Sequence, residues 1–157
     1  VMETCREYTQ DLPVLAAALL HDVLEDTAIS LRELHAFLTS VMDAGVAAIT
    51  HHLVVELTDV YVKSEYPQLN RRTRRTKEAE RLAGVSAEAQ TIKYADIIDN
   101  TVDIAKQEND FALVYIRESK QMLQLIDKGV PALYERAVKT VDEALQAFFV
   151  KANIKAL

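Results

Sequence analysis

Apolar residues recur every three or four positions along most of this chain, which is the spacing of helices with one buried face. The pattern predicts helices over residues 30–40, 43–61, 86–104, 111–128 and 131–152, and a basic helix from residue 70 to about residue 84. Ser30, Asp43, Asn70 and Ser86 stand where residues that cap helix N-termini are expected. We therefore predict an all-α fold, a compact single-domain helical bundle over residues 1–157.

Residues 13–26 have a different pattern, because they are almost all apolar until His21. Such a segment is typical of a helix that is buried on every side, so we predict that it is the central helix of the bundle. Asp11 is expected to cap this helix, and Pro13 is tolerated in its first turn.

Composition narrows the possibilities further. The 157 residues are 50% hydrophobic, with only 3 Gly and 3 Pro, which favours one helical domain with one core. The formal charge of -6 argues against nucleic-acid or anionic-membrane partners. A single cysteine and the lack of a long apolar run lead us to expect a cytoplasmic protein. The chain begins with Val1 within a helical pattern, so we expect that an N-terminal segment is missing. The oligomeric state is left open.

Four ionisable residues, His21, Asp22, Glu25 and Asp26, end the apolar segment. Carboxylates at a helix C-terminus meet the negative end of the helix dipole, and a bound cation would reverse this disadvantage. Imidazole and carboxylate groups suit manganese, iron or zinc. The alternative is a solvated helix end beside a hydrogen-bonded core histidine.

A second group of polar residues, Lys93, Asp96 and Asn100, lies in the segment predicted to be helical over residues 86–104. Asp96 and Asn100 are four positions apart and share one helix face, among apolar neighbours. Such side chains need partners, which a metal ion or a substrate hydroxyl could supply, although an internal hydrogen bond would also serve.

A basic run stands out in this acidic protein, with Arg71, Arg72, Arg74 and Arg75 at its start. Guanidinium groups bind phosphate through paired hydrogen bonds, so the run is a candidate phosphate-binding surface. The alternative is a solvated helix face whose arginines pair with neighbouring acids.

Three motifs together resemble the HD superfamily of metal-dependent phosphohydrolases. LAAALLHDVLEDT at residues 15–27 is similar to the helix that ends in the His-Asp doublet of that family, and IKYADIIDN at 92–100 is similar to the later helix with a distant aspartate ligand. The ED pair and VVELTD at 54–59 resemble the RelA/SpoT-type (p)ppGpp hydrolases. The resemblance covers about residues 12–103 and implies a helical bundle of the HD-domain type.

The resemblance implies a site and a reaction. His21, Asp22 and Asp96 would bind a divalent metal, most simply Mn²⁺, while Glu25 and Asp26 would position and activate the attacking water. Asn100 would contact the substrate, with Arg71, Arg72, Arg74 and Arg75 on its phosphates. The substrate would be a small phosphorylated nucleotide, guanosine-3',5'-bis(diphosphate), cleaved at its 3' position as by a 3'-pyrophosphohydrolase.

One departure leaves two alternatives open. The family takes a further histidine ligand from a preceding helix, and no histidine precedes His21 here, although a missing N-terminal segment could hold it. The first alternative is an HD-type nucleotidase that acts on other nucleoside phosphates. The second is a non-catalytic ligand-binding domain with an incomplete metal site.

Overall fold

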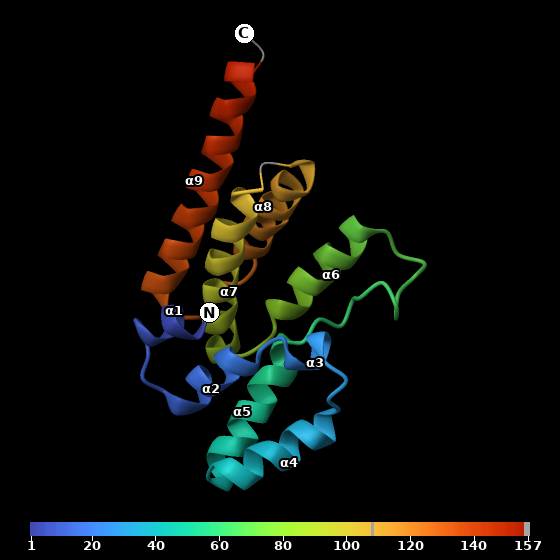
Figure 1. The fold of residues 1–157 in the computed structure, drawn as a ribbon, viewed down its shortest axis with the longest axis vertical. Helices are drawn as coiled ribbons and strands as arrows, with labels where there is room; N and C mark the ends of the chain where they lie inside the picture. Colours follow the sequence, from blue (N-terminus) through green and yellow to red (C-terminus); the bar gives the residue numbers. More distant parts are fainter. Residues whose placement is uncertain (108, 156–157) are drawn as a thin grey trace.

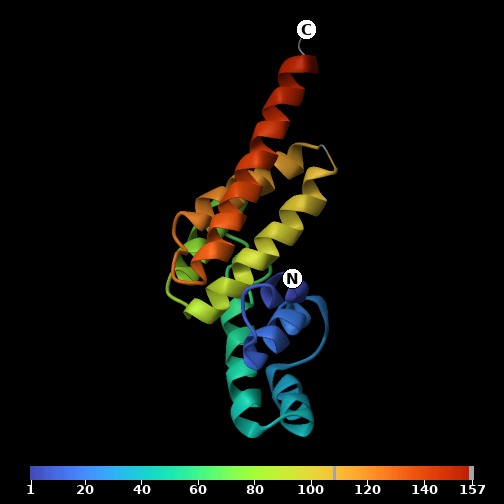
Figure 2. The ribbon, with the colours of Figure 1, turned by 90° about the vertical axis from the view of Figure 1, so that its left-hand side faces the viewer.

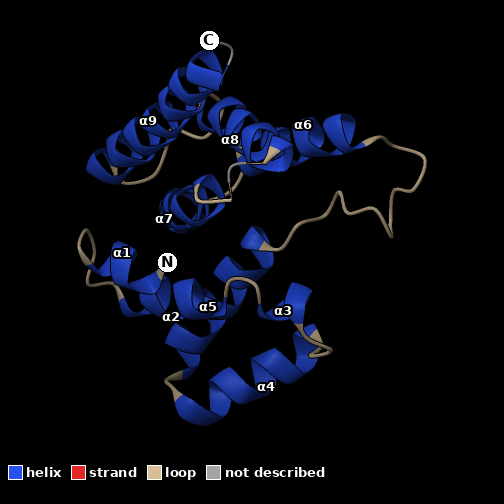
Figure 3. Ribbon diagram, turned by 45° about the horizontal axis from the view of Figure 1, so that its top comes forward, coloured by secondary structure: helices blue, strands red, loops and turns tan. Residues whose placement is uncertain are grey.

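Helix α7 (Ala87–Ala105) lies in the middle of the fold, between two groups of helices (Figure 3). On one side are α1 (Met2–Arg6), α2 (Leu12–Leu20) and α5 (Ala44–Leu57), and on the other are α8 (Asp110–Leu123) and α9 (Pro131–Lys155). Ile92, Tyr94, Ala95 and Ile97 of α7 are buried, because helices cover it on several sides. The computed structural model describes residues 1–107 and 109–155.

Three further helices complete the fold. Helix α4 (Leu31–Val41) packs against α5 as a hairpin, the short α3 (Val23–Asp26) follows α2, and α6 (Arg71–Leu82) lies against α8 (Figure 1). The long α9 extends beyond the other helices in both side views (Figure 1, Figure 2). Over the described ranges the chain forms helices and no strand, which confirms the all-α prediction. None of the helices described there combines the length and the apolar character needed to cross a membrane.

The predicted helix starts are confirmed where a polar side chain caps the helix. Ser30 and Glu33 form a reciprocal capping box at α4, because each side chain bonds the backbone N–H of the other. Asp43, Asn70 and Ser86 each accept a backbone N–H of the following turn. The exception is Asp11, which precedes α2 as predicted but whose side chain accepts no capping hydrogen bond.

The predicted single helix over residues 13–26 is wrong, because α2 stops at Leu20 and α3 begins at Val23. Asp22 leaves helical geometry at the break, with φ -98° and ψ 1°. The segment is not buried on every side either, since Leu19 is 66% exposed. The central helix is therefore α7 rather than this segment.

Helices α5 and α8 end earlier than predicted, because tertiary hydrogen bonds take up the backbone that follows them. After α5, the backbone N–H groups of Val60 and Tyr61 donate to the Glu78 carboxylate at 3.0 Å each. After α8, the buried Ile126 carbonyl accepts the Tyr94 hydroxyl at 3.1 Å. Bonds to α6 and α7 thus replace the continued helices that the apolar pattern predicted.

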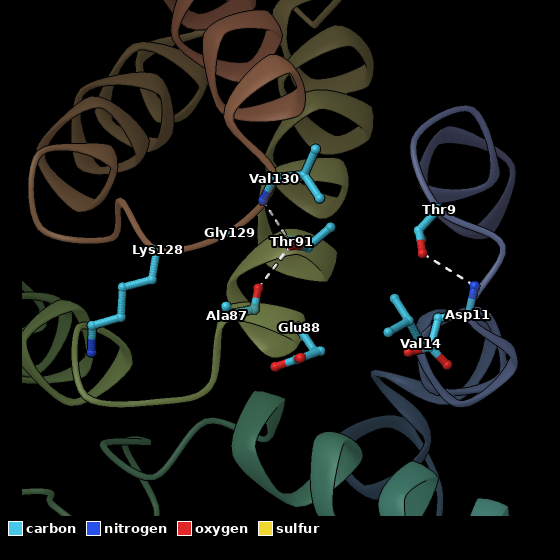
Figure 4. Close-up of a pocket in the computed structure, with 9 residues that line it drawn as sticks. All are labelled: Thr9, Asp11, Val14, Ala87, Glu88, Thr91, Lys128, Gly129 and Val130. Carbon is cyan, nitrogen blue, oxygen red and sulfur yellow. Dashed lines mark hydrogen bonds between the residues drawn. The ribbon is translucent and has the colours of Figure 1, made fainter.

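The loop between α8 and α9 is fastened to α7 at Gly129. The backbone N–H of Gly129 donates to the Tyr94 hydroxyl at 3.1 Å. The next N–H, of Val130, donates to Thr91 Oγ1 at 3.0 Å, as Figure 4 shows. A Cβ atom at Gly129 would lie 2.5 Å from the Tyr94 ring and 2.8 Å from the Thr91 backbone nitrogen. Only glycine therefore lets the loop approach α7 this closely.

We expect Gly129→Ala to lower the free energy of unfolding by about 1–3 kcal/mol, because the added methyl group would overpack the contact with α7. Urea denaturation measures this change. Gly45→Ala is the matched control: its Cβ would meet only the capping carboxylate of Asp43, at 3.1 Å, and neither backbone nor a ring. We expect the control to change stability by less than about 0.5 kcal/mol, and equal effects of the two variants would contradict this account.

Glu78 fixes the corner between α5 and α6. Its side chain is buried, and besides the two N–H groups it accepts the Arg81 guanidinium at 2.7 Å. Glu78→Ala would leave these donors buried without an acceptor, so we expect a loss of about 3–5 kcal/mol in the free energy of unfolding. Thermal and urea unfolding measure this loss. The control is Glu80→Ala, at an exposed neighbouring position, whose free energy of unfolding should stay close to that of the parent protein. A Glu78→Ala protein as stable as that control would refute the role of Glu78.

Candidate functional site

The imidazole of His21 stands at the end of α2 with both ring nitrogens engaged. Nδ1 lies 3.0 Å from the carbonyl oxygen of Ala18, and since a carbonyl only accepts, Nδ1 carries a proton and donates it. Nε2 faces the opposite way and is directed at carboxylates. The backbone bond therefore fixes which nitrogen is available to the site.

The Asp22 and Asp96 carboxylates both lie close to His21 Nε2. Asp22 Oδ2 is 3.0 Å away and Asp96 Oδ1 is 3.6 Å away. Neighbouring residues in an unbroken helix do not face each other, so the break at Asp22 explains how its side chain reaches the ring of the preceding residue. The structure thus brings together the three residues that the resemblance names as metal ligands.

Asp96 is held in place by partners on its own helix. The carboxylate is buried, only 5% exposed, and receives Lys93 Nζ on Oδ2 at 2.8 Å and Asn100 Nδ2 on Oδ1 at 2.6 Å. Burial raises the pKa of Asp96, but the charge of Lys93 and the nearby His21 ring outweigh it and hold the pKa well below its usual range. The buried carboxylate is therefore ionised.

A positive charge is stabilised at His21 Nε2. The hydrogen bond with Asp22 and the nearby Asp96 carboxylate raise the pKa of His21 to about 10, although burial lowers it. A neutral imidazole with its proton on Nδ1 would turn the lone pair of Nε2 toward two carboxylates, which is repulsive. This position between three side chains therefore requires a cation, either a proton or a metal ion.

Glu25 joins the group through the segment after α5. Its Oε1 accepts the backbone N–H of Asp59 at 2.9 Å, while the Asp59 carboxylate binds Arg75 Nη1 at 3.0 Å. Glu25 is exposed as a residue, yet partial desolvation of its carboxylate raises the pKa of Glu25, and the bond from Asp59 partly offsets this. Asp26 is exposed, and no described residue bonds its carboxylate, so the structure does not connect it to Asp96.

Two residues of this region were given no role by the sequence patterns. Lys93 is largely buried; burial lowers its pKa, but the charges of Asp96 and Asp59 raise it above its usual value. Burial and the charge of Asp96 also raise the pKa of the half-buried Tyr115 hydroxyl. The three-residue spacing of Lys93 and Asp96 could have indicated their pairing, and Asp59 ends the VVELTD motif, whereas nothing in the sequence points to Tyr115.

The arginines of α6 mostly have partners within the protein. Arg71 binds both oxygens of Glu118, at 3.0 and 2.7 Å, and Arg75 binds Asp59. Arg74 donates to the carbonyl of Leu69. Arg72 alone of the four forms no hydrogen bond or ion pair with the described residues. Binding of substrate phosphates by these arginines stays a prediction.

The donor types around His21 suit a divalent ion, but they do not form a finished metal site. In the described part of the chain, no three His, Cys, Asp or Glu side chains form a group that could hold a metal ion as they stand. The reason is visible at Asp96, whose two oxygens are taken by Lys93 and Asn100. Asp22 is 53% exposed and free to turn, so the fit lies in chemistry and proximity rather than in a preformed geometry.

Comparisons of the chain with protein-family models, with curated proteins and with solved structures found no match.

Proposed function

We propose that this chain is a metal-dependent phosphohydrolase whose site is centred on His21, Asp22 and Asp96. One observation carries the proposal: Nε2 of His21 faces the carboxylates of Asp22 and Asp96, from distant parts of the chain, at a point where a cation is required. The resemblance of the surrounding motifs to HD-type hydrolases supports the same conclusion.

His21, Asp22 and Asp96 would hold the ion, most simply Mn²⁺. A divalent ion here would supply Lewis-acid polarisation of a phosphoryl oxygen. Two hydrogen bonds would hold the ligands in position for the ion: the Ala18 carbonyl fixes the imidazole of His21, and Asn100 orients the Asp96 carboxylate. Lys93 keeps Asp96 ionised and adds a positive charge beside the phosphate-binding position.

Glu25 is the better supported of the two water-activating candidates. One of its oxygens is fixed by the Asp59 N–H, and the other has no described partner and can accept a proton. Asp26 is exposed on the same short helix and would act from the rim.

For the substrate we propose a cytoplasmic phosphorylated nucleotide, (p)ppGpp in the first instance, cleaved at the ribose 3' position. The support is the resemblance of residues 15–27, 54–59 and 92–100 to the RelA/SpoT-type hydrolases. Asn100 lies at the edge of the site, where it could contact the sugar as well as Asp96.

The pairing of the arginines favours a second candidate, a nucleotidase that acts on simpler nucleoside phosphates. Arg71 and Arg75 already bind carboxylates, and Arg74 binds a carbonyl, so an extended phosphate clamp would require breaking these bonds. A substrate with a single phosphate needs no such clamp.

We expect Asp96→Asn to abolish stoichiometric Mn²⁺ binding and to lower kcat/KM by at least roughly 100-fold, because a ligand contributing several kcal/mol to charge stabilisation is lost. Titration calorimetry and phosphate-release assays measure both effects. Asp103→Asn is the control, since Asp103 lies on the same helix and, among the described residues, pairs with the exposed Lys106 alone. Circular dichroism checks that both variants are folded.

Two results would overturn the proposal. If Asp96→Asn bound Mn²⁺ as tightly as the control does, Asp96 would not be a metal ligand. Substoichiometric metal and no hydrolysis in the parent protein would instead indicate a non-catalytic ligand-binding domain.

Substrate preference separates the two enzymatic candidates. With Mn²⁺, we expect kcat/KM for (p)ppGpp to exceed that for guanosine monophosphate by at least about tenfold, since each additional strong contact in the transition state is worth about 1.4 kcal/mol. Rates are compared by chromatography of the nucleotide products. Efficient cleavage of the monophosphate with (p)ppGpp left intact would favour the nucleotidase.

A further inference from the structure

A cavity of about 300 Å³ lies between α6 and α8, away from the residues of the candidate metal site. Each helix contributes one stripe of side chains at helical spacing. The lining residues include Arg72, Arg75 and Ala79 of α6 and Glu118, Gln121 and Met122 of α8. Figure 3 shows the two helices next to each other.

One end of the cavity is positively charged. Glu118 is its only acidic lining residue, and both of its oxygens are bound by Arg71. Arg75 forms an ion pair with Asp59 at 3.0 Å, and its buried Nε–H lies 3.7 Å from Glu118, within ion-pair range but without a hydrogen-bond acceptor. Arg72 lines the same cavity without a partner among the described residues. Two guanidinium groups therefore retain donors for an added anion.

The other end is apolar. Helices α6 and α8 run in the same direction. At its start, α6 contacts α8 through the ion pair of Arg71 with Glu118. After both helices have ended, Lys128 donates to the carbonyl of Ala83. Ala79, Met122 and Leu125 thus follow the charged groups along the cavity. The side-chain amides of Gln121 and Gln124 line it as well, and neither has a hydrogen bond to a described residue.

We propose that this cavity binds a small amphipathic organic anion, with a phosphate, sulfonate or carboxylate group at Arg72 and Arg75 and an apolar or aromatic body against Ala79, Met122 and Leu125. The buried N–H of Arg75 lacks an acceptor, which an anion would supply. A cavity of this volume is at the lower limit of ligand sites, which suits a molecule with one ring system. None of the proposed metal ligands lines the cavity, and the proposal gives Arg72 and Arg75 a different ligand from the substrate phosphates that the sequence predicted for them.

The probe is 1-anilinonaphthalene-8-sulfonate, an aromatic sulfonate whose fluorescence rises when it leaves water. It is titrated into the folded chain with EDTA present, so that the result does not depend on the metal site. We expect one saturable site per chain. Arg72→Gln and Leu125→Asp should each weaken binding by about tenfold or more, because a charge-assisted hydrogen bond or apolar burial is lost.

Arg32→Gln is the matched control, since Arg32 is an exposed arginine of α4, outside the cavity lining. It should leave the dissociation constant unchanged. Near-ultraviolet circular dichroism checks that each protein is folded, because the probe also binds loosened proteins. Arg72 is exposed and unpaired, so its replacement is not expected to affect folding.

Competition then tests the class of ligand. Phenyl phosphate should displace the probe at a concentration at least about tenfold lower than inorganic phosphate does, since only the former has an apolar body. Equal competition would overturn the amphipathic assignment. Absence of saturable binding, or equal weakening by Arg72→Gln and Arg32→Gln, would overturn the site itself.

Discussion

A carboxylate buried in the central helix requires positive partners, and the position of several elements follows from this requirement. An isolated buried charge is too costly to persist, so Asp96 is surrounded by Lys93, Asn100 and the His21 ring. Because His21 comes from α2, the same compensation joins the N-terminal helices to α7. The same interaction places a positive charge at His21 Nε2, between α2 and α7.

The sequence predicted most of the helices because their signals are local. Caps at Ser30, Asp43, Asn70 and Ser86 depend on side chains within three residues, and the structure contains each of them. Helix ends were predicted less well, since they depend on distant groups such as Glu78 and Tyr94. The uniform apolar run before His21 concealed the break at Asp22, which arises from tertiary contacts.

The candidate site, like the helices, was predicted from the sequence only in part. His21, Asp22 and Asp96 meet as the motifs implied, whereas the sequence did not reveal that Asp59 would connect Glu25 to Arg75. From charge alone, the sequence could not decide whether the arginines of α6 bind phosphates or pair with acidic side chains of the protein. Only the folded chain identifies Glu118, which lies on a different helix, as the partner of Arg71.

Helix α6 is attached through ion pairs along its length and through the buried Ala79 and Leu82 in its second half. Glu78 and Arg81, in the second half, are shielded, but the Arg71–Glu118 pair in the first half is reached by solvent. Dissolved ions screen exposed pairs over about 8 Å at physiological ionic strength and affect buried ones far less. Rising salt therefore weakens the Arg71–Glu118 contact at the start of α6 more than the Glu78 contacts near its end.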